Sequence, residues 1–229
     1  MIGNVLIFII ALLPVVILGC YIYSKDRDKE PIKMIVKLFI GGLLSALLSI
    51  CLSFGFRLSF GNAFEGSKTT FFNTILYSFV YISFIEEISK FVMTFLFSYN
   101  SKEYDQFYDM VVYSTFIALG FAWIENILYS YDGGLQVALL RGLLSVPAHV
   151  SVSVFMGYYL SLSKIAENNK QRNLKIKYIL LSIFIPTFLH GIYDFLIYYN
   201  NYVCIYFYYL FVIILYRRAY LKVKVSSLM

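Results

Sequence analysis

The sequence predicts an all-α membrane protein, a bundle of about seven transmembrane helices with the amino terminus outside and the carboxyl terminus in the cytoplasm. Of its 229 residues, 60% are hydrophobic and 14% are charged, and the mean hydropathy is +0.74. A soluble domain has nearer to 25% charged residues. Apolar runs of about 20 residues, enough to cross a hydrocarbon core, favour helices over a barrel of short alternating strands. We expect one transmembrane domain over residues 1–229.

Seven apolar segments have the composition of membrane-spanning helices. The first is followed by a charged run from Lys25, and it lacks the basic start and small-residue cleavage site of a signal peptide, so we interpret it as a helix. The second contains Gly41-Gly42, which suits close helix packing. The expected spans are Met1 to Tyr23, Met34 to Phe56, Phe71 to Phe97, Tyr108 to Tyr129, Leu135 to Leu162, Tyr178 to Tyr199 and Tyr202 to Tyr216.

Polar segments separate these spans. Arg57 to Thr70, with its glycines and small polar residues, is expected to be a loop after the second span. Asp132-Gly133-Gly134 is expected to turn the chain between the fourth and fifth spans. Lys164 to Lys177 is expected to form a basic loop before the sixth span, and Arg217-Arg218 to end the seventh.

The lysines and arginines are distributed unequally between the two sides of a seven-span chain. Fifteen of the 19 fall on one side, whereas Arg57, Lys68 and Arg141 fall on the other and Lys90 lies within a span. Because cytoplasmic loops carry the excess of basic residues, this distribution predicts the orientation given above. It also explains the net charge of +6 without a nucleic-acid partner, and we expect none.

The three cysteines lie in apolar segments and have neither CxxC nor metal-ligand spacing. We expect Cys20, Cys51 and Cys204 to behave as small hydrophobic residues without a disulfide.

Two adjacent carboxylates and an ammonium interrupt the third span. Glu86 and Lys90 share one face of a helix at i, i+4, whereas Glu87 lies about 100° further round. We therefore expect one carboxylate to be neutralised locally and the other to find its partner elsewhere. Each such group costs roughly 2.5–3.5 kcal/mol at mid-bilayer, so the three demand partners, a wet cavity or a function.

Both histidines of the chain also lie inside expected spans. His149 and His190 lie at the same depth as Glu86, Glu87 and Glu125, about 13 to 17 residues from the predicted cytoplasmic ends, or roughly 20–25 Å. A lone histidine in a membrane helix is often only an interhelical hydrogen-bonding residue. Two histidines and three glutamates at one depth predict a shared cavity instead.

The residue types in this set suit hydrolysis. A glutamate in a dehydrated cavity can take a proton from water and return it, which makes Glu86 or Glu87 a candidate general base. The histidines could bind a developing oxyanion, or they could ligate a single zinc-like divalent metal together with a carboxylate. The sequence leaves open whether a metal is used at all. Asp194, four residues after His190, could orient its imidazole, and Lys90 and Arg141 are expected to be counter-ions.

Five short motifs are distributed over nearly the whole chain. They are Asp26…Glu30-Pro31, Glu86-Glu87-x-x-Lys90, Phe121-x-x-x-Glu125-Asn126, Arg141 with Pro147-x-His149, and His190-x-x-x-Asp194. Their order, spacing and placement in helices resemble the PrsW family of intramembrane proteases. The resemblance also implies kinship with the prenyl-protein (CAAX) endopeptidases, whose second motif has a histidine where this chain has Glu125.

The resemblance implies a multi-pass bacterial cell-membrane protease that makes the first, site-1 cut in a membrane-anchored anti-sigma factor. That cut starts the release of a stress-response sigma factor. The implied partners are the lipid bilayer and a single-span membrane protein substrate. The expected catalytic residues are Glu86, Glu87, Glu125, His149 and His190, with Lys90, Asn126, Arg141 and Asp194 in support.

Two other classes of protein would use similar residues. Buried glutamate, histidine and aspartate also form proton relays in coupled transporters, although such proteins usually show internal hydropathy repeats, which this chain lacks. A non-catalytic membrane scaffold with the same fold is the third class. We favour the protease that the resemblance implies, with Glu86 and Glu87 as base and water-orienting carboxylates and Glu125 as a further carboxylate of the active site.

The predicted orientation can be tested by cysteine labelling from outside intact cells. In a chain without its native cysteines, a cysteine at Asp132 should react with an impermeant maleimide, whereas one at Lys170 should react only after the cells are permeabilised. The basic residues place these positions on opposite sides. Labelling of position 170 in intact cells would reverse the topology.

Overall fold

A computed structural model describes residues 2–60, 70–199 and 201–229. These ranges contain helices and no strand, which confirms the all-α prediction. The helices are α1 Ile2–Lys25, α2 Ile32–Phe60, α3 Phe71–Ile75, the π-helix η2 Leu76–Phe84, α4 Ile85–Ser98, α5 Asp109–Leu143, α6 Ser145–Asn168, α7 Arg172–Tyr198 and α8 Tyr202–Ser226.

Helical stretches long and apolar enough to cross a membrane number five within the described ranges. They are Ile7–Lys25, Ile32–Phe60, Asp109–Asn168, Arg172–Tyr198 and Tyr202–Ser226. Large apolar side chains on their outer surfaces, such as Leu13 and Ile213, are exposed as a lipid-facing surface would be. The protein is therefore a helical polytopic membrane protein, whereas the count of seven passes and the orientation of the termini stay predictions.

The chain reverses direction at Gly134, as the sequence predicts. This glycine has φ +72° and ψ −166° inside the helical stretch that α5 names. Before the reversal Trp123 contacts Phe8 of α1, and after it Gly142 packs close to Pro14, also of α1. Residues 135–143 therefore run back along α1. Leu144 then separates this stretch from α6, which begins at Ser145.

Three expected boundaries are wrong. The helix of the seventh span does not end at Arg217-Arg218, because α8 continues to Ser226. The basic loop expected over Lys164 to Lys177 is largely helical, because α6 continues to Asn168 and α7 begins at Arg172, which leaves residues 169–171 as the connection. The loop expected over Arg57 to Thr70 begins later than predicted, since residues 57–60 belong to α2 and residues 61–69 lie outside the described ranges. Charged side chains can extend a helix beyond the bilayer without altering its hydrogen bonds, so hydropathy underestimates helix length.

The expected third span is one continuous helical stretch made of three segments, an α-helix, a π-helix and a second α-helix. Thr70 begins it as an N-cap, with its side chain accepting a hydrogen bond from the Asn73 backbone N–H. The short α3 then passes into the π-helix η2 and into α4 without a loop. π-helical turns are rare and are frequent at functional sites. Here they lie directly before the Glu86-Glu87 pair.

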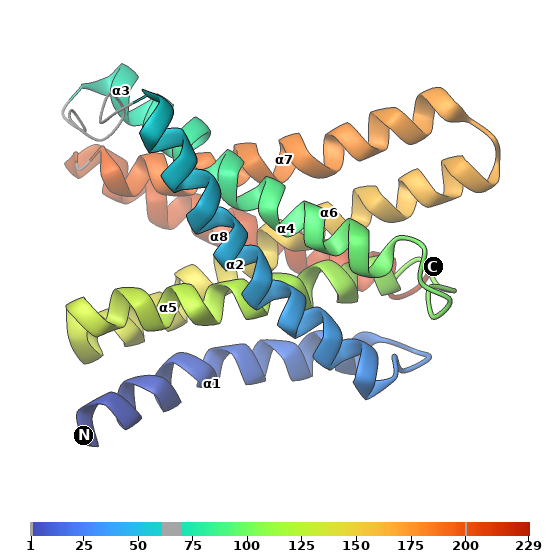
Figure 1. Cartoon of the computed structure of the whole chain (residues 1–229), viewed down its shortest axis with the longest axis horizontal. Helices are drawn as coiled ribbons and strands as arrows, with labels where there is room; N and C mark the ends of the chain where they lie inside the picture. The colour runs from blue at the N-terminus through green and yellow to red at the C-terminus, as the bar shows by residue number, and fades with distance from the viewer. Residues whose placement is uncertain (1, 61–69, 200) are drawn as a thin grey trace.

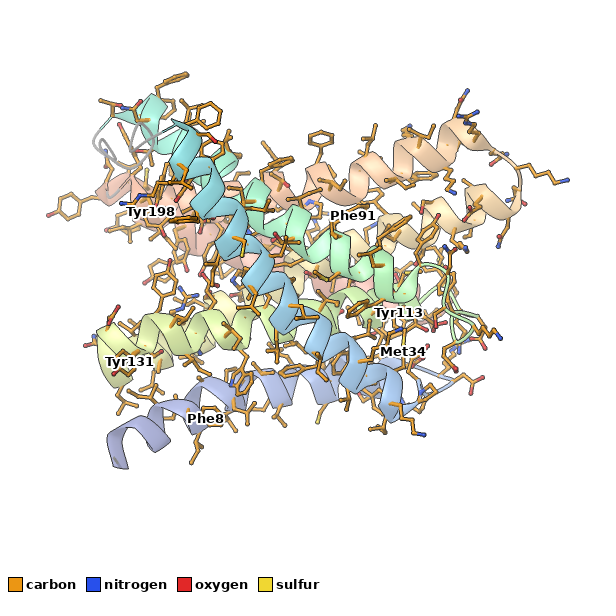
Figure 2. All side chains as sticks on the ribbon, in the orientation of Figure 1. Phe8, Met34, Phe91, Tyr113, Tyr131 and Tyr198 are labelled. Carbon is orange, nitrogen blue, oxygen red and sulfur yellow. The ribbon has the colours of Figure 1, made fainter. Side chains whose placement is uncertain are left out.

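Helix α5 forms the centre of the bundle. Residues from Met110 to Ala122 along it are almost all buried, and α1, α2 and α6 pack around it. Figure 1 shows α1 running alongside α5 while α2 crosses it, and Figure 2 shows side chains filling the spaces between the ribbons. The crossing of α2 and α5 is close because Gly42 faces Gly120 there.

A hydrogen-bonded corner joins α1 to α2. Tyr113 of α5 donates a 2.7 Å hydrogen bond to Glu30 Oε1, and Tyr23 donates one of 2.9 Å to the Glu30 carbonyl oxygen. The Glu30 N–H in turn donates to Asp26 Oδ2 at 3.2 Å. Burial, reinforced by the nearby charges of Asp109 and Asp26, raises the pKa of Glu30 to about 7. The Asp26…Glu30-Pro31 motif thus fixes how the first two helices leave the core.

Replacing Gly120 with alanine should push α2 and α5 apart. An added Cβ would lie 2.2 Å from the Phe39 carbonyl oxygen, a backbone atom that cannot rotate away. We expect the free energy of unfolding in detergent to fall by about 1–3 kcal/mol, as for other overpacked sites. Gly55→Ala is the matched control, because a Cβ there meets nothing within 4 Å. Equal stability of the two variants would contradict the close crossing.

Candidate active site

Residues from four helical segments meet inside the bundle. Glu86, Glu87 and Lys90 lie on α4, Glu125 on α5, His149 on α6, and His190 and Asp194 on α7, while Arg141 lies in the stretch after the Gly134 reversal. Their side chains contact one another in a continuous series. The residues that the sequence places at one depth are therefore neighbours in the fold.

Lys90 is the hub of this cluster. Its side chain is fully buried, and its ammonium lies 2.7 Å from Glu87 Oε1, 3.4 Å from Glu86 Oε2 and 3.1 Å from His149 Nδ1. It also lies 4.1 Å from the centroid of the Phe121 ring. An ammonium only donates hydrogen bonds, so His149 Nδ1 accepts from it, and Nε2 then carries the proton of the neutral ring. Lys90 thereby selects the tautomer of His149.

Glu87 is the carboxylate that Lys90 holds most closely. The side chain has no exposed surface, and Oε1 also accepts a 2.8 Å hydrogen bond from His190 Nδ1. Lys90 thus pairs with both carboxylates of its own helix, more closely with Glu87 than with Glu86, and it is Glu87 that also binds a group on another helix. Spacings of i, i+3 and i, i+4 both allow contact on a helix, and burial of Lys90 turns its ammonium toward Glu87.

Glu125 is paired with two groups. Arg141 donates to its Oε2 at 2.9 Å, and His149 Nε2 lies 2.7 Å from the same oxygen. The Arg141 guanidinium in addition lies over the Tyr129 ring, 4.1 Å from its centroid. The expectation that Arg141 is a counter-ion agrees with this geometry.

His190 is held between three carboxylates. With Nδ1 on Glu87, its Nε2 faces Asp194 Oδ2 at 3.4 Å and Glu86 Oε2 at 3.9 Å. Its ring lies perpendicular to that of His149, with 5.1 Å between the centroids. The two imidazoles and Glu86 therefore surround one small region.

Glu86 also faces a cavity of about 400 Å³. Its side chain is 13% exposed, whereas that of Glu87 is 0% exposed, so the two neighbours differ in access. The cavity is lined by residues of η2, α4, α5, α6, α7 and α8, among them Glu125, Arg141, His149, His190 and Asp194. Such a polar space has room and partners for water.

Asn126 lies apart from this series of contacts. It is buried, and its Oδ1 accepts a 3.4 Å hydrogen bond from Ser130 one turn along α5. Among the described residues its Nδ2 has no hydrogen-bond partner. Its part in the motif next to Glu125 is therefore to pack α5 rather than to contact the histidines.

Comparison with known proteins identifies relatives over most of the chain. The model of a family described as "PrsW family intramembrane metalloprotease" matches residues 30–217. The chain belongs to the PrsW family. "Protease PrsW" of Oceanobacillus iheyensis is 34% identical over 184 residues, which cover 80% of this chain and 79% of that protein. "Protease PrsW" of Bacillus subtilis is 34% identical over 185 residues, with 80% and 79% covered, and that of Clostridioides difficile is 34% identical over 197 residues, with 83% and 79% covered.

No solved structure matches this chain. The family match decides between the three classes of function that the sequence allowed, because PrsW proteins are intramembrane proteases. Together with the long apolar helices, it makes this chain a membrane-embedded protease of the bacterial cell membrane.

The metal that the PrsW family description implies fits residues of this cluster. Glu86, His149 and His190 each offer one ligand atom, and these three atoms lie within 4.8 Å of one another. Two imidazoles and a carboxylate with an open position form a common catalytic zinc set, and Glu87 would orient His190 from behind through its Nδ1. His149 would exchange one present partner, Lys90 or Glu125, for the cation.

Sequence reasoning missed several residues of the PrsW site. Ser83 donates a 3.4 Å hydrogen bond to Asp194 Oδ2, and Tyr208 donates one of 3.0 Å to Tyr193 beside the cavity. Tyr129 lines the cavity one helical turn after Glu125. The spacing of one helical turn from Glu125 would have indicated Tyr129. Tyr193 and Tyr208 carry no such signal among the 22 tyrosines of the chain.

Replacing Lys90 with methionine should destabilise the PrsW fold. The change leaves Glu87 buried beside one imidazole without its ammonium. Loss of one partner of a buried pair typically costs about 3–5 kcal/mol, so the denaturation midpoint in detergent should fall clearly. The exposed Lys102→Met is the control. Adding Glu87→Gln to Lys90→Met should recover part of the loss, and a Lys90→Met protein as stable as the control would refute the hub role.

Proposed function

We propose that this chain makes the site-1 cut in a membrane-anchored anti-sigma factor by activating water with Glu86. The observation that carries the proposal is the difference between the two adjacent carboxylates. Glu86 lines the cavity, with its closest cation at 3.4 Å, whereas Glu87 is enclosed and bound by Lys90 at 2.7 Å. A general base must reach the water that it deprotonates, and Glu86 meets that condition.

Glu125 is the other glutamate on the cavity wall, but it is more fully neutralised. Arg141 and His149 both contact its Oε2 within 3 Å. A carboxylate held in this way is a weak proton acceptor. We assign Glu125 to positioning His149 and Arg141 toward the substrate.

The donors around Glu86 suit an oxyanion. His190 approaches it from α7 and Arg141 lines the same cavity, and His149 of α6 could join them by turning its Nε2–H from Glu125 to the oxyanion. When the scissile carbonyl becomes tetrahedral, N–H groups directed at its oxygen stabilise the negative charge, and one such donor is worth roughly 10²–10³-fold in rate. Glu87 holds His190 for this role through its Nδ1 and so acts as a positioning residue.

A zinc-like cation held by Glu86, His149 and His190 would polarise the carbonyl and acidify the water when bound. In that case Glu86 would be a ligand, and Glu125 and Asp194 would be the other carboxylates that line the cavity. Glu87 would hold His190 through its Nδ1 in either case.

The substrate follows from the location of the cluster and from the family. The residues lie among helices of membrane-spanning length, so the peptide that reaches them comes from a membrane protein. The family resemblance narrows this class to a single-span anti-sigma factor, whose first cut would release a sigma factor.

Replacing Glu86 with glutamine should abolish cleavage while the protein still accumulates. Glutamine keeps the size and hydrogen bonding of the side chain but removes the proton acceptor, so the rate should fall by about 10²–10⁴-fold. Cleavage of a reconstituted single-span substrate is the measurement, with the exposed Glu103→Gln as control. Full activity of Glu86→Gln would refute the assignment. Loss of activity of the native chain on treatment with a chelator would show that the reaction requires the cation.

A further inference from the structure

A second cavity, of about 370 Å³, lies on the other side of Glu86. It is enclosed by α2, by η2 and by α5 rather than by α6, α7 and α8. Its wall contains Glu86 and Glu125 again, together with Ile82 and Tyr129. These four residues line both cavities, so the two spaces meet at the proposed reacting groups.

The shared wall is made of two pairs of residues one helical turn apart. Ile82 and Glu86 lie at i, i+4 at the junction of η2 and α4, and Glu125 and Tyr129 lie at i, i+4 on α5. Side chains at this spacing lie one above the other on a helix face. The two carboxylates can thus be reached from both sides of the wall.

The two cavities differ in chemical character. The first contains Arg141, Asp194 and both histidines. The second has small residues of α2 on one side, Ala46, Ser49 and Ser53, with Arg57 further along the same helix, and aromatic residues of η2 on the other, Tyr77 and Tyr81. Small residues at i, i+3 and i+7 share one face of a helix, so α2 leaves space where a larger side chain would fill the cavity.

Side chains of α2 form the border between the second cavity and the lipid-facing surface. Ile50 and Phe54 line the cavity and are also exposed, whereas Leu52 is exposed and does not belong to the cavity wall. Beside them Phe56 of α2 meets Tyr81 of η2 with 5.6 Å between ring centroids. A segment that moves laterally from the bilayer therefore meets side chains of α2 and η2 at the edge of the cavity.

We infer that the two cavities hold the substrate on either side of the scissile bond, and that Ser49 and Ser53 limit the size of the substrate side chain in the α2 cavity. The inference rests on the proposed function, because it takes Glu86 as the position of the reaction. An endopeptidase must accommodate chain on both sides of the bond that it cuts. The structure has a cavity on each side of Glu86 that can take these two parts of the chain.

Ser53 offers a direct test of the size limit, because it is half-buried and lines the cavity without joining the charged cluster. The measurement is kcat/KM of the full chain, reconstituted in bilayer, for single-span peptides that differ in one residue beside the cut. With Ser53→Phe, peptides carrying a large residue on one side should be cut at least ~10-fold more slowly, while glycine or alanine there keeps the native rate within about twofold. The control is Leu52→Phe, which adds the same ring on the exposed face.

An unchanged residue preference in Ser53→Phe, or an equal loss for every peptide, would overturn the inference. The proposed function would be unaffected as long as Glu86→Gln remains inactive, since that variant tests the chemistry and not the subsite. Conversely, cleavage by Glu86→Gln together with an altered preference in Ser53→Phe would retain the subsite and reject Glu86 as base.

A second measurement needs neither turnover nor the phenylalanine variant. In an inactive Glu86→Gln chain with Cys20, Cys51 and Cys204 replaced by serine, a cysteine at position 53 should form a disulfide with a substrate cysteine next to the cut. A cysteine at position 52 should not. Cross-linking from 52 and not from 53 would place the substrate on the outer face of α2 and reject the cavity.

Discussion

The structure depends on burying one ammonium completely. Lys90 has no exposed side-chain surface, and a bare charge at that depth would be too costly to keep. The carboxylates that neutralise it come from its own helix, and the imidazole that accepts its hydrogen bond comes from α6, so the packing of these two helices is constrained. Glu87 then binds His190 of α7, and His149 binds Glu125 of α5. One desolvated cation thus organises four helical segments and sets the orientation of both imidazoles.

The same constraint separates two adjacent residues of identical type. Once Lys90 and His190 occupy Glu87, its carboxylate serves to hold other groups. Glu86 is left at the wall between the two cavities, near both imidazoles, with the Lys90 ammonium at 3.4 Å as its closest cation. Glu87, which is fully buried, therefore has a structural role, whereas Glu86, which the cavities reach, is available for the reaction. Buried ion pairs are weak evidence of stability, but a paired network that fixes imidazole orientation gives a site its geometry.

Sequence patterns predicted most of the helices and the membership of the cluster. Long apolar runs imply helices because lipid offers the backbone no other hydrogen-bond partner, and two histidines at the depth of three glutamates implied one site. The π-helix from Leu76 to Phe84 could not be predicted, because its composition is that of any apolar helix. Neither could the choice of Glu87 over Glu86 by Lys90, since both spacings permit contact and tertiary burial decides. The cavity beside α2 was missed because small residues such as Ser49 also indicate close packing.

The central claim is that Glu86, and not Glu87, is the carboxylate open to the reaction. Chemical modification measures this directly: the full chain in detergent is treated with a carbodiimide and an amine, and peptide mass spectrometry follows each glutamate while cleavage is assayed in parallel. Glu86 should be modified well before Glu87, and activity should be lost at the rate of Glu86 modification. Faster modification of Glu87, or loss of activity while Glu86 is intact, would contradict the account.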